Sequence, residues 1–199
     1  DLVRSRGLGD VYKRQVFFMA GVSGPWIAGD IEELYSAGVQ KVIIFGNCGV
    51  LDSKIEDCSI IIPTKGFRDE GTSYHYVSPS ETIEINPDYK EDFIKILNEY
   101  NFDYTEGYTW TIDAFYRETK DKIKYFKDNG AVCVEMEGTV IASVCQRLNM
   151  KYFTFYYAGD NLDSTVWDKR SIEGPTNIDK KKEVLLLALE LAVVLNNYE

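Results

Sequence analysis

The chain has 199 residues, of which 45% are hydrophobic and 14% aromatic, so it can bury one sizeable core, and a single domain is the default. Acidic residues (32) outnumber basic ones (22), the formal net charge is -10, and no long basic run occurs, which argues against nucleic acid or an anionic membrane as a partner. The longest apolar run, near 184–195, is interrupted by Glu190 and is too short to span a bilayer.

The cysteines and the single histidine limit the possible redox and metal chemistry of the chain. No CxxC spacing occurs, and three of the four cysteines lie in apolar surroundings, which is typical of reduced core thiols. No signal peptide is recognisable, so we expect a cytoplasmic protein. His75 alone cannot make a His-rich metal site, and we expect no metal. The four cysteines are Cys48, Cys58, Cys133 and Cys145.

The first fifteen residues differ from the rest of the chain. They are basic and contain glycine, and they lack the apolar periodicity that begins at Val16. We therefore interpret 1–15 as a non-native leader and 16–199 as the domain.

Along the domain, strand patterns alternate with helix patterns, which predicts the α/β class. A polar and aromatic stretch, 65–80, is too long for a simple turn and is a candidate site loop. Strands are expected over 16–20, 41–45, 58–63, 104–112, 131–134 and 152–157, and helices over 27–35, 87–100, 120–127, 140–148 and 179–196.

Four of the predicted strands end in polar or glycine-rich segments, namely 46–49, 113–118, 135–137 and 159–163. Parallel strands place such segments on one edge of a sheet, where they can share a pocket. This convergence is stronger than any single motif.

The segment Glu135-Met136-Glu137 follows a buried strand and precedes a helix. Its carboxylates can accept hydrogen bonds from the vicinal hydroxyls of a sugar, while the thioether covers an apolar ring face. Alternatively, Glu135 is a solvated strand end and Glu137 a first-turn residue that interacts with the helix dipole. Spacing alone leaves both interpretations open.

The other segments also allow two interpretations. The amides of Gly46-Asn47-Cys48-Gly49 can face an anion, or the glycines can simply mark a turn. Phe115 and Tyr116 can stack on a planar base, or belong to the core. Partial burial can raise the pKa of Asp160 enough for general acid catalysis, or this residue can form an Asx-turn or helix cap.

Taken together, four motifs in this order resemble the nucleoside phosphorylase family, which includes purine nucleoside phosphorylases, uridine phosphorylases and methylthioadenosine/adenosylhomocysteine nucleosidases. The resemblance extends from about Val16 to the C-terminus. The motifs are the turn 134–137, the glycine segment 46–49, the stretch from Arg68 to Tyr76 (RDEGTSYHY) and the Gly159-Asp160 turn.

The resemblance implies a single-domain three-layer sandwich around a central mixed, largely parallel sheet. It implies a pentosyltransferase that cleaves the N-glycosidic bond of purine nucleosides with phosphate, giving free base and ribose 1-phosphate. The alternatives are a uridine phosphorylase, a hydrolytic nucleosidase that uses water, and a catalytically impaired nucleoside-binding module. Phosphate is a co-substrate, no metal or organic cofactor is implied, and a homo-oligomer is expected, either a dimer or a hexamer built as a trimer of dimers.

The resemblance also assigns roles to individual residues. Asp160 is the acid that protonates the purine N7, and Arg170 assists it. Glu135, Met136 and Glu137 bind the ribose, with Glu137 on the 2′ and 3′ hydroxyls, while Phe115, Cys48 and Gly49 lie against the base. Phosphate is assigned to Gly46, Asn47 and Arg68.

Two departures from the family pattern accompany these roles. Ile44 stands where the family has a phosphate-binding arginine, so phosphate would need Arg68, or water would replace it as the nucleophile. The family's opening segment also has no counterpart before Val16. We therefore expect an N-terminally truncated member with reduced turnover.

Overall fold

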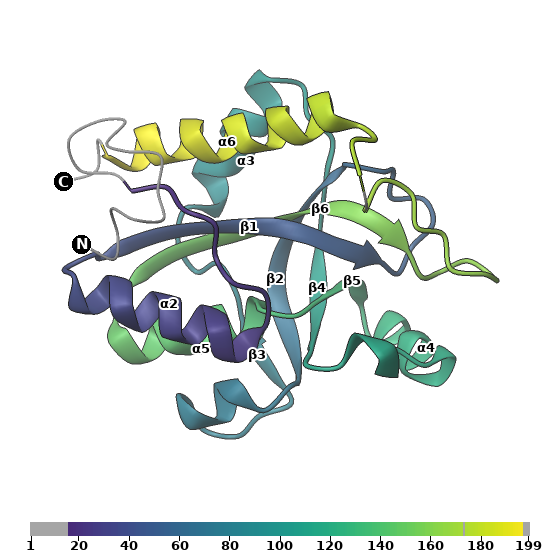
Figure 1. Ribbon diagram of the computed structural model, residues 1–199, viewed down its shortest axis with the longest axis horizontal. Coiled ribbons are helices and arrows are strands. Elements are labelled where there is room, and N and C mark those ends of the chain that lie inside the picture. Colours follow the sequence, from purple (N-terminus) through teal and green to yellow (C-terminus); the bar gives the residue numbers. More distant parts are fainter. Residues whose placement is uncertain (1–15, 173, 197–199) are drawn as a thin grey trace.

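The computed structural model describes residues 16–172 and 174–196 (Figure 1), and the predicted leader 1–15 lies outside the described residues. The strands are β1 (Lys41–Val50), β2 (Ile60–Asp69), β3 (Thr82–Glu84), β4 (Tyr104–Ile112), β5 (Ala131–Glu135) and β6 (Lys151–Asn161). The helices are α2 (Gly24–Ser36), α3 (Lys90–Glu99), α4 (Lys120–Asp128), α5 (Gly138–Leu148) and α6 (Ile178–Asn196), with short 3-10 turns η1 (Thr72–His75) and η2 (Phe115–Arg117).

The six strands form one mixed sheet in the order β3-β2-β4-β5-β1-β6. A further antiparallel pairing joins β2 to β6, which closes five of the strands into a ring. The predicted α/β class and mixed sheet are therefore confirmed, but the predicted three-layer sandwich is corrected to a closed barrel. Register shifts after Cys48, Pro63 and Tyr108 mark bulges, and bulges increase the local bend and twist that closure requires.

The carboxyl ends of three strands meet at one place in this barrel. β1 lies parallel to β6 along its whole length, whereas β1 and β5 are antiparallel. The antiparallel pair overlaps only at Gly49 with Val134 and Val50 with Cys133, which are the last residues of β1 and the end of β5. Because the overlap is so short, the ends of β1, β5 and β6 lie side by side although the strands run in different directions.

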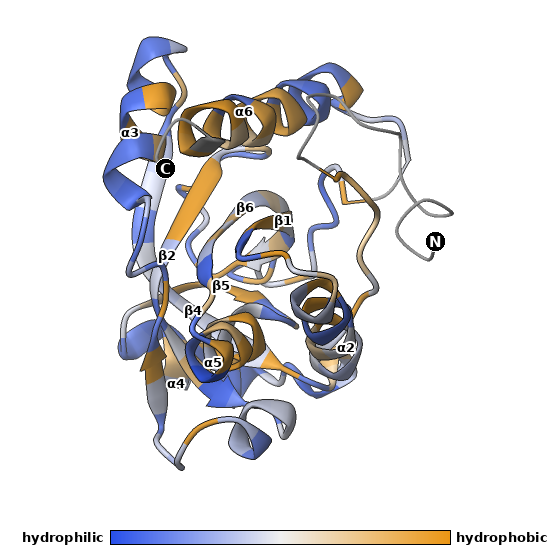
Figure 2. Cartoon of the chain, turned by 90° about the vertical axis from the view of Figure 1, so that its left-hand side faces the viewer, coloured by the Kyte–Doolittle hydropathy of each residue, from blue (hydrophilic) through white to orange (hydrophobic). Residues whose placement is uncertain are grey.

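Helices cover the barrel in pairs (Figure 1). α2 and α5 bury one apolar cluster that includes Ile27, Ile31 and Val144, and α3 and α6 bury another that includes Phe93 and Leu191. Figure 2 shows hydrophobic residues on α5 and α6 and on the strands beside them. Burying such amphipathic faces is the main stabilising contribution to each helix.

A third cluster fills the inside of the ring. Its buried members come from strands and one loop, without any helix, and they are Cys48, Val50, Ile55, Ile61, Cys133, Tyr156 and Ala158. α4 closes another side, where Phe126 stacks on Trp110 with ring centroids 4.4 Å apart. All four cysteines are free and buried, as predicted.

The structure changes several predicted boundaries. The strand expected over 16–20 is wrong: within it only Phe18 forms a bridge, and Met19 is 86% exposed, so the segment is not the buried strand that its apolar residues suggested. Segments 46–49 and 159–161 lie inside β1 and β6, since their backbones continue to pair across the bulge. β2 begins two residues later and ends six residues later than the strand predicted over 58–63, and β3 was not predicted. The strand over 104–112 is confirmed.

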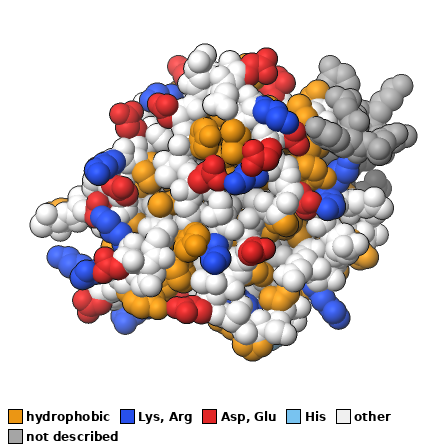
Figure 3. Space-filling view, turned by 180° about the vertical axis from the view of Figure 1, so that it is seen from behind, with side chains coloured by type: hydrophobic (Ala, Val, Ile, Leu, Met, Phe, Trp, Pro, Cys, Tyr) orange, Lys and Arg blue, Asp and Glu red, His pale blue; other side chains and the backbone are white. Residues whose placement is uncertain are grey.

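Basic side chains are scattered singly among acidic ones on the face seen in Figure 3. Of the helices that the structure describes, none combines the length and apolar character needed to cross a bilayer.

Candidate active site

The turn between β5 and α5 is organised by the buried carboxylate of Glu135. One of its oxygens accepts hydrogen bonds from the hydroxyls of Thr109 (2.9 Å) and Thr111 (2.6 Å) on β4. The other accepts from the backbone amides of Glu137 (2.7 Å) and Gly138 (2.5 Å) at the start of α5. Burial raises the pKa of Glu135, and these four donors oppose that shift. Because each oxygen already accepts two hydrogen bonds, Glu135 fixes the turn and offers no free acceptor.

Glu137 is the more accessible carboxylate of the pair. Its oxygens accept from the backbone amides of Ser23 (2.5 Å) and Met136 (3.3 Å). Burial, and then the charge of Glu135, raise the pKa of Glu137 to about 7. Ser23 precedes α2 with a positive φ of 101°. Glu137 therefore joins the start of α2 to the start of α5, where an acceptor is favoured by both helix dipoles.

Two further segments meet at the start of α2. A Cβ added at Gly24 would lie 2.9 Å from Val140 Cγ2 and 3.4 Å from Thr72 Oγ1, so the absence of a side chain permits this close approach. Asp113, just beyond β4, accepts a hydrogen bond from the amide of Gly71 (2.8 Å). The loop after β2, the end of β4 and the starts of α2 and α5 thus surround Glu137.

Asp160 lies at the end of β6, opposite Gly49 of β1 in the register. A Cβ at Gly49 would come within 3.1 Å of Asp160 Oδ1 and 2.3 Å of Leu162 Cδ1, so only glycine leaves room for both. The other carboxylate oxygen, Oδ2, accepts a hydrogen bond of 2.7 Å from the indole nitrogen of Trp167. Burial raises the pKa of Asp160, and the Trp167 hydrogen bond and the charge of Arg170 partly offset this.

The register of the sheet places Asp160 two strands from the residue that precedes the Glu135-Met136-Glu137 turn. Asp160, Gly49 and Val134 occupy adjacent positions on β6, β1 and β5, and neighbouring strands are about 4.8 Å apart. Burial, Cys133 and the charges of Glu135 and Asp160 all raise the pKa of the Cys48 thiol. Gly49 and Asp160 therefore lie beside the end of β5, which the Glu135-Met136-Glu137 turn follows directly.

Two predicted residues are placed differently. Arg170 makes its hydrogen bond to the carbonyl oxygen of Ile55 (2.8 Å) and pairs with Asp168 (3.7 Å), so its influence on Asp160 is through charge at a distance. Phe115 is 52% exposed and packs against Tyr116, with ring centroids 4.3 Å apart.

Two of the residues predicted to bind phosphate, Arg68 and Asn47, make contacts within the chain. Arg68 is buried and donates to Ser73 Oγ, the Ser78 carbonyl and Ser80 Oγ, each at 2.8 Å, and its remaining terminal nitrogen, Nη2, has no partner in the described part of the chain. Asn47 is exposed, and its side chain hydrogen-bonds the Tyr157 hydroxyl. Ile44 packs against the apolar cluster of α2 and α5.

Sequence reasoning missed three residues that contact the predicted carboxylates: Thr109, Thr111 and Trp167. Thr109 and Thr111 are two residues apart in a predicted strand, so their hydroxyls lie on the same face, which is a detectable signal. Trp167 carried no such signal, because its position depends on loop conformation, whereas Glu118 belongs to the predicted segment 113–118. Burial, and then the charge of Asp160, raise the pKa of Glu118 to about 7.

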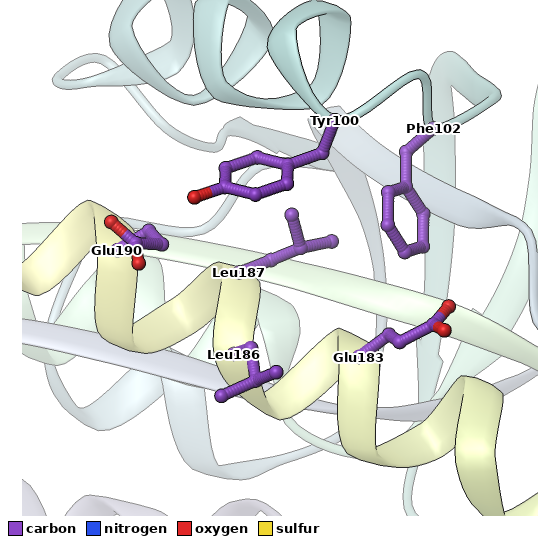
Figure 4. A pocket seen from close by; sticks show the side chains of 6 residues that line it. All are labelled: Tyr100, Phe102, Glu183, Leu186, Leu187 and Glu190. Carbon is purple, nitrogen blue, oxygen red and sulfur yellow. The ribbon is translucent and has the colours of Figure 1, made fainter.

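Two surface hollows lie elsewhere. One of about 320 Å³ is bordered by Tyr100 and Phe102 after α3 and by α6 residues such as Leu187, with Tyr100 directed along α6 toward Glu190 (Figure 4). Another, of about 330 Å³, lies between Tyr35 and Lys151. No predicted site residue lines either hollow. Within residues 16–172 and 174–196, no cluster of three or more His, Cys, Asp or Glu side chains could hold a metal ion.

This chain is similar to known proteins, but two of the alignments cover only about half of the relative's length. A guanosine phosphorylase of Halorubrum lacusprofundi is 24% identical over 131 residues, which are 66% of this chain and 54% of that protein. Protein R802 of Acanthamoeba polyphaga mimivirus is 29% identical over 133 residues, 67% of this chain and 51% of that protein. The chain thus spans about half the length of these relatives.

Longer matches also exist. A DeoD-type purine nucleoside phosphorylase of Bacillus cereus strain B4264 is 25% identical over 178 residues, 87% of this chain and 73% of that protein. The crystal structure of an AMP nucleosidase from Bacteroides thetaiotaomicron has a similar fold, with a TM-score of 0.71 at 16% identity over 89% of this chain and 70% of that one. The family model described as "Phosphorylase superfamily" matches residues 13–193. The chain therefore belongs to the phosphorylase superfamily.

Proposed function

We propose that this chain binds a nucleoside where the ends of β1, β5 and β6 meet, and that it forms part of an enzyme that cleaves the N-glycosidic bond of purine nucleosides. The observation that carries the proposal is the placement of two carboxylates with different environments around Cys48 and Gly49. Glu137 is a half-buried acceptor beside two helix starts, and Asp160 is a buried carboxyl at the end of β6.

The chemistry of glycosidic cleavage needs these two environments. Positive charge develops on the sugar and negative charge on the departing base, so the site must hold the sugar hydroxyls and protonate the base. Glu137 accepts hydrogen bonds from the 2′ and 3′ hydroxyls, replacing those of Ser23 and Met136. Asp160, whose pKa is raised by burial, gives its proton to the purine N7. Met136 covers the sugar face, and Glu135 keeps the turn in place.

We assign the nucleophile to phosphate, which attacks the anomeric carbon and gives ribose 1-phosphate. Gly46, Asn47 and the unpartnered Nη2 of Arg68 are the groups proposed to bind it. Water is the second candidate, because Ile44 supplies no charge and three donor contacts of Arg68 are used within its own loop. Neither route calls for a metal or an organic cofactor.

We further propose a cytoplasmic homo-oligomer, a dimer or a hexamer. Support comes from aromatic side chains beside the site: Phe115 is 52% exposed and Tyr116 90% exposed. A second copy would cover these rings and place them closer to a bound base.

Base release from inosine, adenosine and uridine, each with and without phosphate, tests the proposal. The chain is compared with a version extended at its N-terminus by the family's opening segment. We expect phosphate-dependent release of hypoxanthine or adenine, at higher rates in the extended version. Release without phosphate would replace the phosphorylase assignment with a nucleosidase, and ligand binding without turnover in either version would favour a binding module.

Substitutions then test the two carboxylates. Asp160→Asn should reduce cleavage of purine nucleosides more than that of uridine, because the acid serves the purine N7; equal losses would contradict that role. Glu137→Ala should weaken nucleoside binding, whereas Glu33→Ala, an exposed change on α2, should not. Unchanged affinity in Glu137→Ala would remove the ribose assignment.

A further inference from the structure

The loop after β6 brings Trp167 back onto Asp160. The loop leaves the strand at Asn161 and returns through a bridge to Asp168, with hydrogen bonds from Asn161 N to Asp168 O (2.8 Å) and from Asp168 N to Asn161 O (3.2 Å). Its other side is held by Asp163, which accepts from the amide (3.0 Å) and hydroxyl (3.1 Å) of Ser53 and pairs with Lys127. The position of Trp167 is therefore set by contacts on both sides of the loop.

Packing does not account for the orientation of this side chain. Trp167 is 58% exposed and the adjacent Val166 is 78% exposed, so little apolar surface is buried here. The specific contact of the indole is its hydrogen bond of 2.7 Å to Asp160 Oδ2. An indole that is mostly in water but bonded to a buried carboxylate is placed by that bond.

The chemistry of the indole makes this bond informative. An indole N–H can donate a hydrogen bond but cannot accept one. While the bond exists, Oδ2 of Asp160 is an acceptor, and because a carbonyl oxygen accepts better than a hydroxyl oxygen, the bond favours a proton on Oδ1 over one on Oδ2. Oδ1 is the oxygen that lies close to Gly49. Gly49 belongs to β1, the strand between β6, which carries Asp160, and β5, which precedes the Glu137 turn.

We propose that Trp167 is a positioning residue that holds Oδ2 of Asp160 as an acceptor and so favours the transferable proton on Oδ1. This role rests on the proposed function, in which Asp160 is the acid. The other ionisable groups around Asp160 are Arg170 and Asp168 on the same loop, Glu118 between η2 and α4, and Cys48 on β1. Trp167, unlike these four groups, donates a side-chain hydrogen bond directly to the Asp160 carboxylate.

The test uses the indole N–H signal itself, which needs no turnover. The chain has three tryptophans, so ¹⁵N-labelled protein gives three indole resonances, and Trp167→Phe identifies the one in question. We expect the Trp167 resonance to shift with pH together with the ¹³C signal of the Asp160 carboxyl group. In Asp160→Asn this titration should vanish. The indole of Trp110, which donates to Asp69 at 3.0 Å, serves as the internal control and should respond equally in both proteins.

The phenylalanine variant separates positioning from packing. It keeps an aromatic ring but removes the donor, so it should raise the pKa of Asp160 by about one unit, because a hydrogen bond to the charged form is lost. The alkaline limb of the base-release profile should move up by the same amount. The inference would be overturned, even in an active enzyme, if the Trp167 indole resonance still titrated in Asp160→Asn. It would also be overturned if the pKa of Asp160 were unchanged in Trp167→Phe. Coupled titrations in a chain that releases no base would instead overturn the proposed function.

Discussion

Removal of the Glu135 carboxylate should destabilise the fold more than removal of an exposed one. Four donors converge on it: the Thr109 and Thr111 hydroxyls and the amides of Glu137 and Gly138. The side chain is 5% exposed, so in Glu135→Ala these donors have little access to solvent water. A buried donor without an acceptor costs about 1–3 kcal/mol, and since neighbouring terms do not add fully, we expect a loss of about 3–5 kcal/mol.

Glu135→Gln separates loss of hydrogen bonds from loss of charge. The amide oxygen can still accept from the amides of Glu137 and Gly138. The new NH₂ group then faces Thr109 and Thr111, whose hydroxyls can accept as well as donate. The glutamine variant should therefore lose only about 1–2 kcal/mol, the typical difference between a charge-assisted and a neutral hydrogen bond.

Urea unfolding followed by fluorescence of the fully buried Trp110 measures these changes. The control is Glu106→Ala, which removes an exposed strand carboxylate paired with Lys90 at 2.8 Å and should cost less than about 1 kcal/mol. If Glu135→Ala and Glu106→Ala lose the same stability, or if glutamine is as damaging as alanine, the account of Glu135 as a four-donor acceptor is wrong.

Two further predictions concern the same strand ends. Gly49→Ala should lower the free energy of unfolding by about 1–3 kcal/mol, because the added Cβ would lie 2.3 Å from Leu162 Cδ1. Gly46→Ala, on the same strand, adds its Cβ in open space and should change stability far less. Equal melting temperatures of the two variants would contradict the close packing at Gly49. The pKa of Glu137 is raised by folding to about 7, so its stabilising contribution is full below pH 4.5 and is lost as pH rises through 7. Stability measured by urea titration should thus fall by up to about 1.4 kcal/mol per pH unit in that window, and Glu137→Gln should flatten the slope while Glu33→Gln leaves it intact.

Local patterns predicted most of the elements. The helices over 120–127 and 179–196 and the strand over 104–112 were recognisable because their apolar spacing reflects burial on one face or in a core. The turn 135–137 was also predictable, because carboxylates that follow an apolar strand directly are unusual. The sequence therefore determined the α/β class, most of the elements from 24 onward and the candidate carboxylates.

Closure of the sheet and the partners of each carboxylate were decided by tertiary structure. The pairing of β2 with β6 joins segments far apart in the chain, and no local pattern specifies it. Glu135 and Glu137 are alike in sequence, yet one is enclosed by four donors and the other faces the start of α2. Hydrogen-bond partners and desolvation set what an ionisable group can do, and both come from residues brought together only when the chain folds.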